Sequence, residues 1–200
     1  MEIFLPLIAG ATCVIADDKQ NKDPRWIIEA IQQHNITCIQ ATPTTWKMLF
    51  DSGYELAPAI KALSGGEALT QAVAAHLAKS HFAWNLYGPT ETTIWSTCLS
   101  ITQEKNNMSP IPIGRAIANT KLYVLNRNLQ PVPIGVSGEL YIAGSGVAVG
   151  YLHKEKLTAE RFIDNPFDVT NKNYSRMYKT GDLVRWLPDG SLYFMGRTDH

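Results

Sequence analysis

Apolar residues recur along this chain in two rhythms that change near its midpoint. In the first half, short apolar runs typical of buried strands alternate with longer segments of helical spacing. The apolar runs cover residues 11–16, 36–41, 60–63 and 82–87. The helical segments cover residues 24–34, 44–51 and 70–79. This alternation predicts a largely parallel sheet with flanking helices, and therefore an α/β fold class.

The helix at residues 24–34 has the clearest boundaries of the three. Its apolar positions are Trp26, Ile27, Ala30 and Ile31. The Asp-Pro pair at positions 23 and 24 supplies an N-cap side chain and a proline in the first turn. We therefore expect this helix to begin at residue 24.

Helical patterning nearly disappears after a polar loop at residues 103–112. Short apolar runs between Gly, Pro, Asn and Asp turns predict strands at residues 121–126, 138–143, 177–178, 183–186 and 191–195. One helical turn is predicted at residues 157–162. This half is expected to form a small distorted β-barrel or curled sheet.

Composition and charge exclude several kinds of partner. The 200 residues carry 18 Lys and Arg against 18 Asp and Glu, so the net charge is zero. No basic field exists to gather nucleic acid or an anionic membrane. The first ten residues lack a basic head, are interrupted by Pro6 and are too short to span a bilayer. Nucleic-acid and membrane partners are therefore not expected.

The three cysteines indicate a cytoplasmic protein. Cys13, Cys38 and Cys98 are far apart, have no paired metal-ligand spacing and are odd in number. Each lies in an apolar or strand-like run, so we predict buried, reduced thiols.

The polar turn at residues 85–93 combines several groups that suit a nucleotide. The Asn85 amide can donate and accept at a base edge, and the Tyr87 ring offers a face for stacking. After a tight Gly-Pro turn, Thr90 and Glu91 place a hydroxyl beside a carboxylate, which are oxygen ligands that suit Mg²⁺. The turn follows a predicted strand, where α/β sheets bind ligands. The alternative is an ordinary strand-turn-strand with a polar tip.

Three motifs in the second half add candidate chemistry. A strand at residues 138–143 runs into a glycine-rich turn that ends at Tyr151, and it could also be a plain hairpin. Asp182 follows a glycine turn and suits the two hydroxyls of a ribose, unless it only bonds its own backbone. Arg197 and Asp199 end the chain with a cation and an acid, which could also form a surface ion pair.

Taken together and in this order, the motifs resemble those of adenylate-forming enzymes, and within them the amino-acid adenylation domains of non-ribosomal peptide synthetases. The resemblance covers essentially the whole chain. It implies that an amino-acid carboxylate attacks the α-phosphate of ATP, giving aminoacyl-AMP and pyrophosphate. The acyl group then passes to the phosphopantetheine thiol of a carrier protein. ATP and Mg²⁺ are the implied cofactors, and carrier and condensation domains of the parent synthetase are the implied partners.

The resemblance also implies a role for individual residues. Thr90 and Glu91 would be catalytic, with Glu91 as the Mg²⁺ ligand. Asp182 would hold both ribose hydroxyls with help from Arg197, and Asp199 would be the hinge to a C-terminal lid. The full set of implied nucleotide contacts is Gly66, Asn85, Tyr87, Gly88, Thr90, Asp182, Phe194 and Arg197.

An amino-acid pocket is implied in the same way. Its walls would be Gln40, Leu63, Gly65, Leu86, Ile94 and Trp95. Gln40 is the clearly polar member, and an unpaired buried amide costs roughly 1–3 kcal/mol. We therefore expect a substrate with a hydrogen-bonding side chain, unless Gln40 belongs to a satisfied polar core. Residues 1–105 would form the α/β subdomain with the amino-acid and adenine pocket, residues 106–196 the barrel-like subdomain, and residues 197–200 the start of the hinge.

Departures from the family pattern limit what the chain is expected to do alone. The family's phosphate loop with its lysine, the acid that holds the substrate amino group, and the lid with the catalytic lysine have no match here. Val149 stands where the family usually has Arg. The chain thus looks like the middle of an adenylation domain and is not expected to turn over alone. Two alternatives stay open, namely an acyl- or aryl-CoA ligase and a non-catalytic nucleotide-binding fragment.

Overall fold

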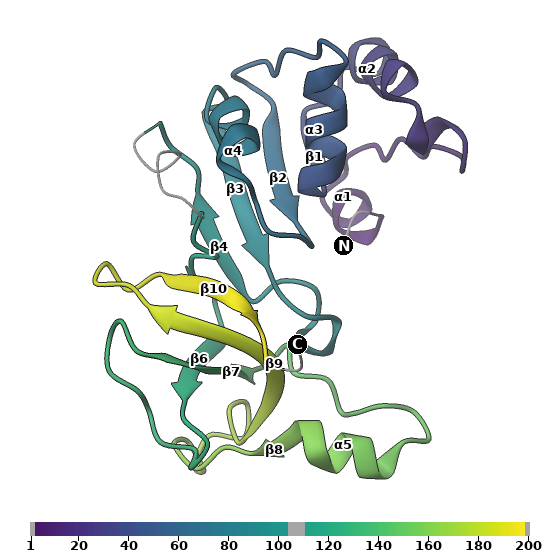
Figure 1. Ribbon diagram of the computed structural model, residues 1–200. Coiled ribbons are helices and arrows are strands. Elements are labelled where there is room, and N and C mark those ends of the chain that lie inside the picture. Colours follow the sequence, from purple (N-terminus) through teal and green to yellow (C-terminus); the bar gives the residue numbers. More distant parts are fainter. Residues whose placement is uncertain (1–2, 104–110, 199–200) are drawn as a thin grey trace. The chain divides into compact units, whose positions relative to one another are not determined.

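The computed structural model describes residues 3–103 and 111–198, which form two compact units (Figure 1). The first unit comprises Met1–Asn85 and Ser100–Ile111, and the second comprises Leu86–Leu99 and Pro112–His200. The chain passes from the first unit to the second near the end of one strand, β3 (Phe82–Tyr87). The polar turn at residues 85–93 therefore begins in the first unit and continues in the second.

The first unit alternates helices and strands, as its sequence pattern predicts. Strands β1, β2 and β3 are neighbours in that order, and β1 pairs with β2 in parallel, with Gln40 opposite Leu63. The elements are α1 (Phe4–Ile8), η1 (Gln20–Lys22), α2 (Pro24–Gln33), β1 (Cys38–Ala41), α3 (Pro43–Asp51), β2 (Lys61–Gly65), α4 (Gln71–Leu77) and β3.

Side-chain caps fix where the helices of this unit begin, and one fully buried aromatic residue anchors α3 to the sheet. Asp23 accepts a hydrogen bond from the Arg25 backbone N–H at 2.9 Å and begins α2 as predicted. Thr42 and Thr70 cap α3 and α4 in the same way. Trp46 of α3 is fully buried, and its Nε1 donates to the Leu63 carbonyl of β2 at 3.1 Å.

Replacing Asp23 with alanine is expected to lower the free energy of unfolding by about 1 kcal/mol, because the first turn of α2 loses its cap. Urea denaturation of both proteins measures the difference. Asp18→Ala, an exposed acid in the preceding loop, is the matched control. Equal losses in the two variants would contradict the capping role.

Two predictions were wrong, one for a run of the first unit and one for the cysteines, of which Cys98 belongs to the second unit. Residues 11–16 form no strand, because the described residues offer this run no neighbouring strand, and Ile15 is exposed. All three cysteines are free, but they are not buried, since Cys38 at the start of β1 is exposed and the other two are half-buried. Within the described residues, no helix is long and apolar enough to cross a membrane.

The second unit is built on a curled antiparallel sheet with the order β10-β9-β7-β6, and β8 pairs with β9. The second unit also contains β4 and β5, which pair in antiparallel orientation. The elements are η2 (Thr90–Thr92), β4 (Thr97–Ser100), β5 (Arg115–Ala116), β6 (Thr120–Leu125), β7 (Ser137–Gly144), α5 (Glu155–Arg161), β8 (Phe162–Asp164), β9 (Arg176–Trp186) and β10 (Leu192–Arg197). A sheet with parallel strands followed by a curled sheet confirms the predicted fold class.

A bulge joins two strands that the sequence predicted as separate. Residues 177–178 and 183–186 belong to the single strand β9, and Gly181 between them has a φ of +77°. Along the pairing, β7 advances two residues from Tyr141 to Glu139 while β9 advances four, from Lys179 to Leu183. The extra residues of β9 are accommodated as a bulge, which redirects side chains at that point.

One apolar cluster of the second unit supports Tyr87 and Phe194, the two aromatic residues predicted to contact a nucleotide. Its buried members are Ile113, Val124, Leu140, Ile142, Val184 and Leu192. Tyr87 and Phe194 pack against this cluster and are themselves only partly buried. They present their rings at the border of the core, where one side of each ring is supported.

Candidate functional site

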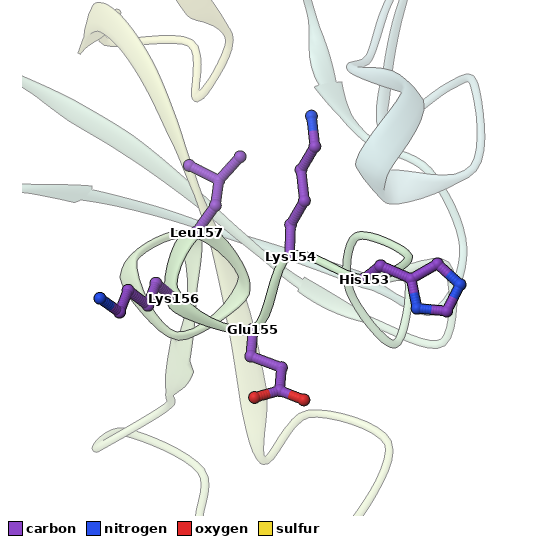
Figure 2. A pocket seen from close by; sticks show the side chains of 5 residues that line it. All are labelled: His153, Lys154, Glu155, Lys156 and Leu157. Carbon is purple, nitrogen blue, oxygen red and sulfur yellow. The ribbon is translucent and has the colours of Figure 1, made fainter.

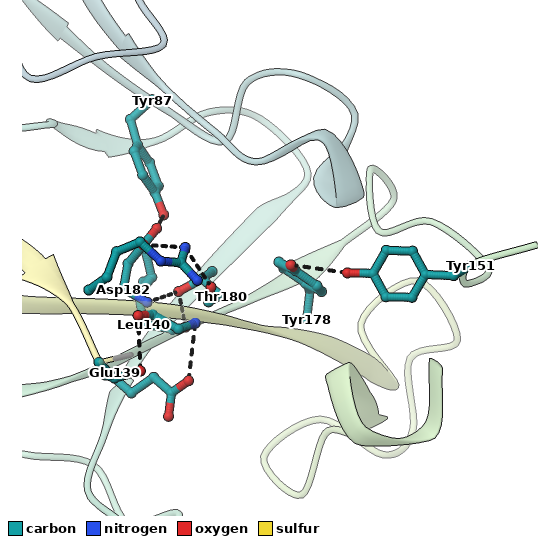
Figure 3. Close-up of polar contacts among 10 residues, drawn as sticks. Tyr87, Glu139, Leu140, Tyr151, Tyr178, Thr180 and Asp182 are labelled. Atoms are coloured by element: carbon teal, nitrogen blue, oxygen red, sulfur yellow. Dashed lines mark hydrogen bonds and ion pairs between the residues drawn. The ribbon is translucent and has the colours of Figure 1, made fainter. Parts of the chain in front are cut away.

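Asp182 lies in the bulge of β9, which three hydrogen bonds hold in place (Figure 3). Its backbone N–H donates to Thr180 Oγ1 at 2.9 Å, and this hydroxyl donates to the Leu140 carbonyl at 2.8 Å. The neighbouring Gly181 N–H donates to Glu139 Oε1 at 3.1 Å. Strand β7 therefore fixes the backbone at Asp182 and, with it, the position from which the Asp182 carboxylate projects.

The Thr180 hydroxyl is fully engaged and buried, so Thr180→Val is expected to lower the free energy of unfolding by about 2 kcal/mol. The valine leaves the Leu140 carbonyl and the Asp182 N–H without their partner. Urea denaturation of the variant tests this. Thr120→Val, which removes an exposed hydroxyl from β6, should stay within about 0.5 kcal/mol of the parent protein. A loss no larger than this for Thr180→Val would contradict the assignment.

Both oxygens of the Asp182 carboxylate already have partners. The Tyr87 hydroxyl donates to Oδ2, and Arg197 Nη1 donates to Oδ1 at 3.1 Å. The Asp182 side chain is 10% exposed and that of Arg197 is 40% exposed. Burial, with the charge and hydrogen bond of Asp182, raises the pKa of Tyr87, so its phenol stays a donor.

An aromatic pair lies next to this carboxylate. The rings of Tyr87 and Phe194 have centroids 6.4 Å apart and planes inclined at 39°. Together with Asp182 and Arg197, they are four predicted nucleotide contacts that the structure brings together in the second unit. The group combines apolar ring surface, a carboxylate and a fixed cation.

Gly88 allows the turn after Tyr87 to close tightly. A Cβ at this position would lie 2.5 Å from the Ile94 carbonyl oxygen and 2.7 Å from the Ser96 backbone nitrogen. Thr93 and Ile94 have φ values of 60° and 75°, which are costly for β-branched residues. This strained turn encloses η2 and presents its carboxylate.

That carboxylate belongs to Glu91 and is held by two tyrosines. The Tyr151 hydroxyl donates to Glu91 Oε1 at 2.6 Å. The same hydroxyl lies 3.4 Å from the Tyr178 hydroxyl (Figure 3). Burial alone would raise the pKa of Glu91, but the tyrosine hydrogen bonds and the positive charge of Arg161 outweigh it and lower the pKa. The lowered pKa favours the ionised form of Glu91.

Arg161 is a site residue that sequence reasoning missed. It ends α5, and a Cβ added at Gly181 would lie 3.2 Å from its Nη1 and 2.9 Å from Nη2 of Arg197. Two guanidinium groups thus reach the same part of the bulge. Position 161 gave no signal, because the sequence predicted only a helical turn there. Tyr151 and Tyr178 lay inside recognised motifs but had no predicted role.

Comparison with known proteins identifies the family of this chain. The sequence profile described as AMP-binding enzyme matches residues 1–152. The chain belongs to the AMP-binding enzyme family. Its membership confirms the resemblance inferred from the motifs.

Relatives of this AMP-binding enzyme include peptide synthetases. A dimodular nonribosomal peptide synthase of Bacillus subtilis (strain 168) is 47% identical over 201 residues, which is 100% of this chain and 8% of the relative. Tyrocidine synthase 3 of Brevibacillus parabrevis is 41% identical over 203 residues, which is 100% of this chain and 3% of the relative. The chain therefore spans less than a tenth of either synthetase.

Solved structures agree with these sequences. A four-domain nonribosomal peptide synthetase bound to AMP and glycine superposes with a TM-score of 0.89 and 39% identity, over 99% of this chain and 15% of that one. A protein containing adenylation and PCP domains gives a TM-score of 0.85 and 28% identity, over 96% of this chain and 39% of that one.

The residues of this AMP-binding enzyme fit a phosphate-bound Mg²⁺ ion. Among residues 3–103 and 111–198, no group of three or more His, Cys, Asp or Glu side chains could hold a metal ion. Glu91 offers one ionised carboxylate, and Thr90 beside it has an exposed hydroxyl. Mg²⁺ is commonly bound by one or two carboxylates plus substrate phosphates, which matches this sparse donor set.

The other predicted site residues of the AMP-binding enzyme are divided between the two units. Gln40, Leu63, Gly65, Gly66 and Asn85 belong to the first unit, and Leu86, Ile94 and Trp95 belong to the second. Asn85 is buried. The amino-acid pocket therefore stays a prediction, and so does the division at residues 105 and 196. Asp199, the predicted hinge, lies outside the described residues.

A shallow hollow at the start of α5 is not part of this site. Residues 153–157 line it, and none of them is a predicted site residue (Figure 2). Lys154 and Leu157 point to one side, whereas Glu155 points to the other (Figure 2). The side chains do not converge on a ligand.

Proposed function

We propose that this chain is part of an adenylation domain that activates an amino acid with ATP, giving aminoacyl-AMP and pyrophosphate. The observation that carries the proposal is the Asp182 carboxylate, held between Tyr87 and Arg197 beside an aromatic pair. Membership of the AMP-binding enzyme family and similarity to a synthetase solved with AMP and glycine support it.

In this proposal the nucleoside is bound by four residues of the second unit. Tyr87 and Phe194 offer ring surface to adenine, and the Asp182 carboxylate accepts hydrogen bonds from the two ribose hydroxyls. Arg197 fixes the Asp182 carboxylate through a charge-assisted hydrogen bond. Asn85 and Gly66 of the first unit would add contacts to the nucleotide.

The phosphates would lie toward Thr90 and Glu91. Thr90 donates a hydroxyl hydrogen bond, and Glu91 holds the metal ion. When bound, Mg²⁺ neutralises the phosphate charge that develops as pyrophosphate leaves. Arg161 adds a second guanidinium near the bulge and favours the ionised form of Glu91. Positioning and charge stabilisation, rather than a covalent enzyme intermediate, would supply the rate enhancement.

The acyl acceptor would be the phosphopantetheine thiol of a carrier protein in a cytoplasmic synthetase that also has condensation domains. Relatives named as peptide synthetases, and a solved protein with adenylation and PCP domains, support this acceptor. The pocket of Gln40, Leu63, Gly65, Leu86, Ile94 and Trp95 would select a polar, glutamine-like amino acid. The amide of Gln40 supports that choice.

Two measurements on the protein expressed from the complete reading frame test the proposal. Calorimetry should show AMP binding without metal and much weaker binding of GMP. Pyrophosphate exchange over a panel of amino acids should be fastest with a polar substrate. Absence of AMP binding would overturn the proposed site, and fastest exchange with leucine or valine would overturn the proposed substrate. Thioester formation on coenzyme A instead of a carrier protein would identify a CoA ligase.

A further inference from the structure

The glycine-rich segment between β7 and Tyr151 contacts the turn that carries Glu91 and forms hydrogen bonds with it. The Ala148 N–H donates to the Glu91 carbonyl at 2.8 Å, and Thr93 Oγ1 donates to the Gly146 carbonyl at 2.7 Å. A Cβ at Gly146 would lie 2.8 Å from the Thr92 carbonyl oxygen. The glycine motif thus serves close backbone contact with η2.

Tyr151 continues this contact with its side chain. Its hydroxyl donates to Glu91 Oε1 at 2.6 Å, and its backbone N–H donates to Thr158 Oγ1 at 2.9 Å. Gly150 before it has a φ of +152°, and a Cβ there would lie 2.4 Å from Thr158 Cγ2. Helix α5 therefore sets the direction of Tyr151 before any ligand arrives.

Phe162 fixes the second tyrosine against the first. Its buried ring lies 5.3 Å from the Tyr151 ring and 5.1 Å from the Tyr178 ring, centroid to centroid. Tyr178 is buried on β9, and its hydroxyl lies 3.4 Å from that of Tyr151. The rings are packed on three elements, so their hydroxyls have little freedom to move.

We propose that Tyr151 and Tyr178 are positioning residues: Tyr151 engages Oε1 of Glu91, Tyr178 holds the Tyr151 hydroxyl, and Oε2 is left for the divalent cation that arrives with the ATP phosphates. The inference rests on the proposed function. Mg²⁺ is commonly bound by one or two carboxylates plus substrate phosphates, so one carboxylate oxygen of Glu91 would be enough to hold it. Hydrogen bonds that orient a metal ligand commonly contribute 10- to 100-fold to metal affinity.

The test uses Tyr151→Phe and Tyr178→Phe in the protein expressed from the complete reading frame. Mn²⁺ binding in the presence of ATP is followed by electron paramagnetic resonance, and AMP binding without metal by calorimetry. We expect Mn²⁺ affinity to fall about tenfold in Tyr151→Phe, and less in Tyr178→Phe, because only Tyr151 contacts Glu91 Oε1 closely. AMP affinity should stay within about twofold, because Asp182 and Arg197 are untouched.

A matched control and a double variant complete the design. Tyr123→Phe removes a hydroxyl that accepts a hydrogen bond from Asn165 elsewhere in the second unit, and it should change neither affinity. In a Glu91→Gln background, Tyr151→Phe should have no further effect on Mn²⁺ binding, because the tyrosine acts through Glu91. This comparison also holds if one single variant folds poorly.

The outcomes separate the two proposals. Normal AMP binding with unchanged Mn²⁺ affinity in both tyrosine variants would overturn the positioning role alone. A parent protein that binds neither AMP nor Mn²⁺ with ATP would overturn the proposed function. A further loss from Tyr151→Phe in the Glu91→Gln background would show that the tyrosine contacts the ligand directly, which also overturns the inference.

Discussion

Replacing Asp182 with asparagine is expected to weaken AMP binding about 100-fold while the second unit stays folded. Hydrogen bonds to a charged group contribute about 1.5–3 kcal/mol each, and two ribose hydroxyls would lose a charged acceptor. Asparagine has the same size, but its amide turns a donor toward either Tyr87 or Arg197, which both donate at present. Calorimetry with AMP, in the absence of metal, measures the loss.

The control for this variant is Asp164→Asn on β8, where the acid is exposed and outside the site. It should leave AMP affinity within about twofold of the parent protein. A similar result for Asp182→Asn would remove Asp182 from the nucleotide site. A large fall in the urea midpoint would instead show that the carboxylate mainly stabilises the bulge.

Replacing Gly88 with alanine should lower the free energy of unfolding by about 3 kcal/mol, because the new Cβ meets backbone atoms that cannot rotate away. It would lie 2.5 Å from the Ile94 carbonyl oxygen and 2.7 Å from the Ser96 nitrogen. Relief requires the turn to open, which would also displace Glu91. Urea denaturation measures the first effect, and Mn²⁺ binding in the presence of ATP measures the second.

Gly135→Ala is the control that separates the steric clash at Gly88 from the backbone strain of replacing a glycine with positive φ. Gly135 has a φ of +84° with nothing within 4 Å of an added Cβ, so alanine there meets only conformational strain of about 1–2 kcal/mol. It should leave Mn²⁺ affinity unchanged. If the two alanine variants lose the same stability and both keep the metal site, the close approach at Gly88 has no special role.

Local signals predicted much of the fold from the sequence. The Asp-Pro pair places the start of α2, and the apolar run 82–87 matches β3 residue for residue. Such signals fail where a distant partner decides the structure. Gly181 reads as a turn in sequence, yet β7 and β10 on either side keep β9 continuous through it. The run 11–16 shows the converse, since apolar residues make no strand without a neighbour.

The site was predictable only in part, for the same reason. The carboxylates and aromatic residues lie in recognisable motifs, so Tyr87, Asp182, Phe194 and Arg197 could be named from a family resemblance. Arg161 could not, because nothing local places the end of α5 beside a bulge of β9. Packing of three separate segments creates that neighbourhood, and no single segment encodes it.

The contact between Tyr87 and Asp182 joins residues 95 positions apart, and Arg197 follows 15 positions later. At a synthesis rate of 5–20 residues per second, Tyr87 leaves the ribosome about 5–20 s before its acceptor exists. Long-range β pairing of this kind also forms slowly. A ligand cannot protect the nascent chain during that interval, because a ligand stabilises only the completed binding site. Synthesis of this unit therefore passes through a period in which its aromatic residues are exposed to chaperones and proteases.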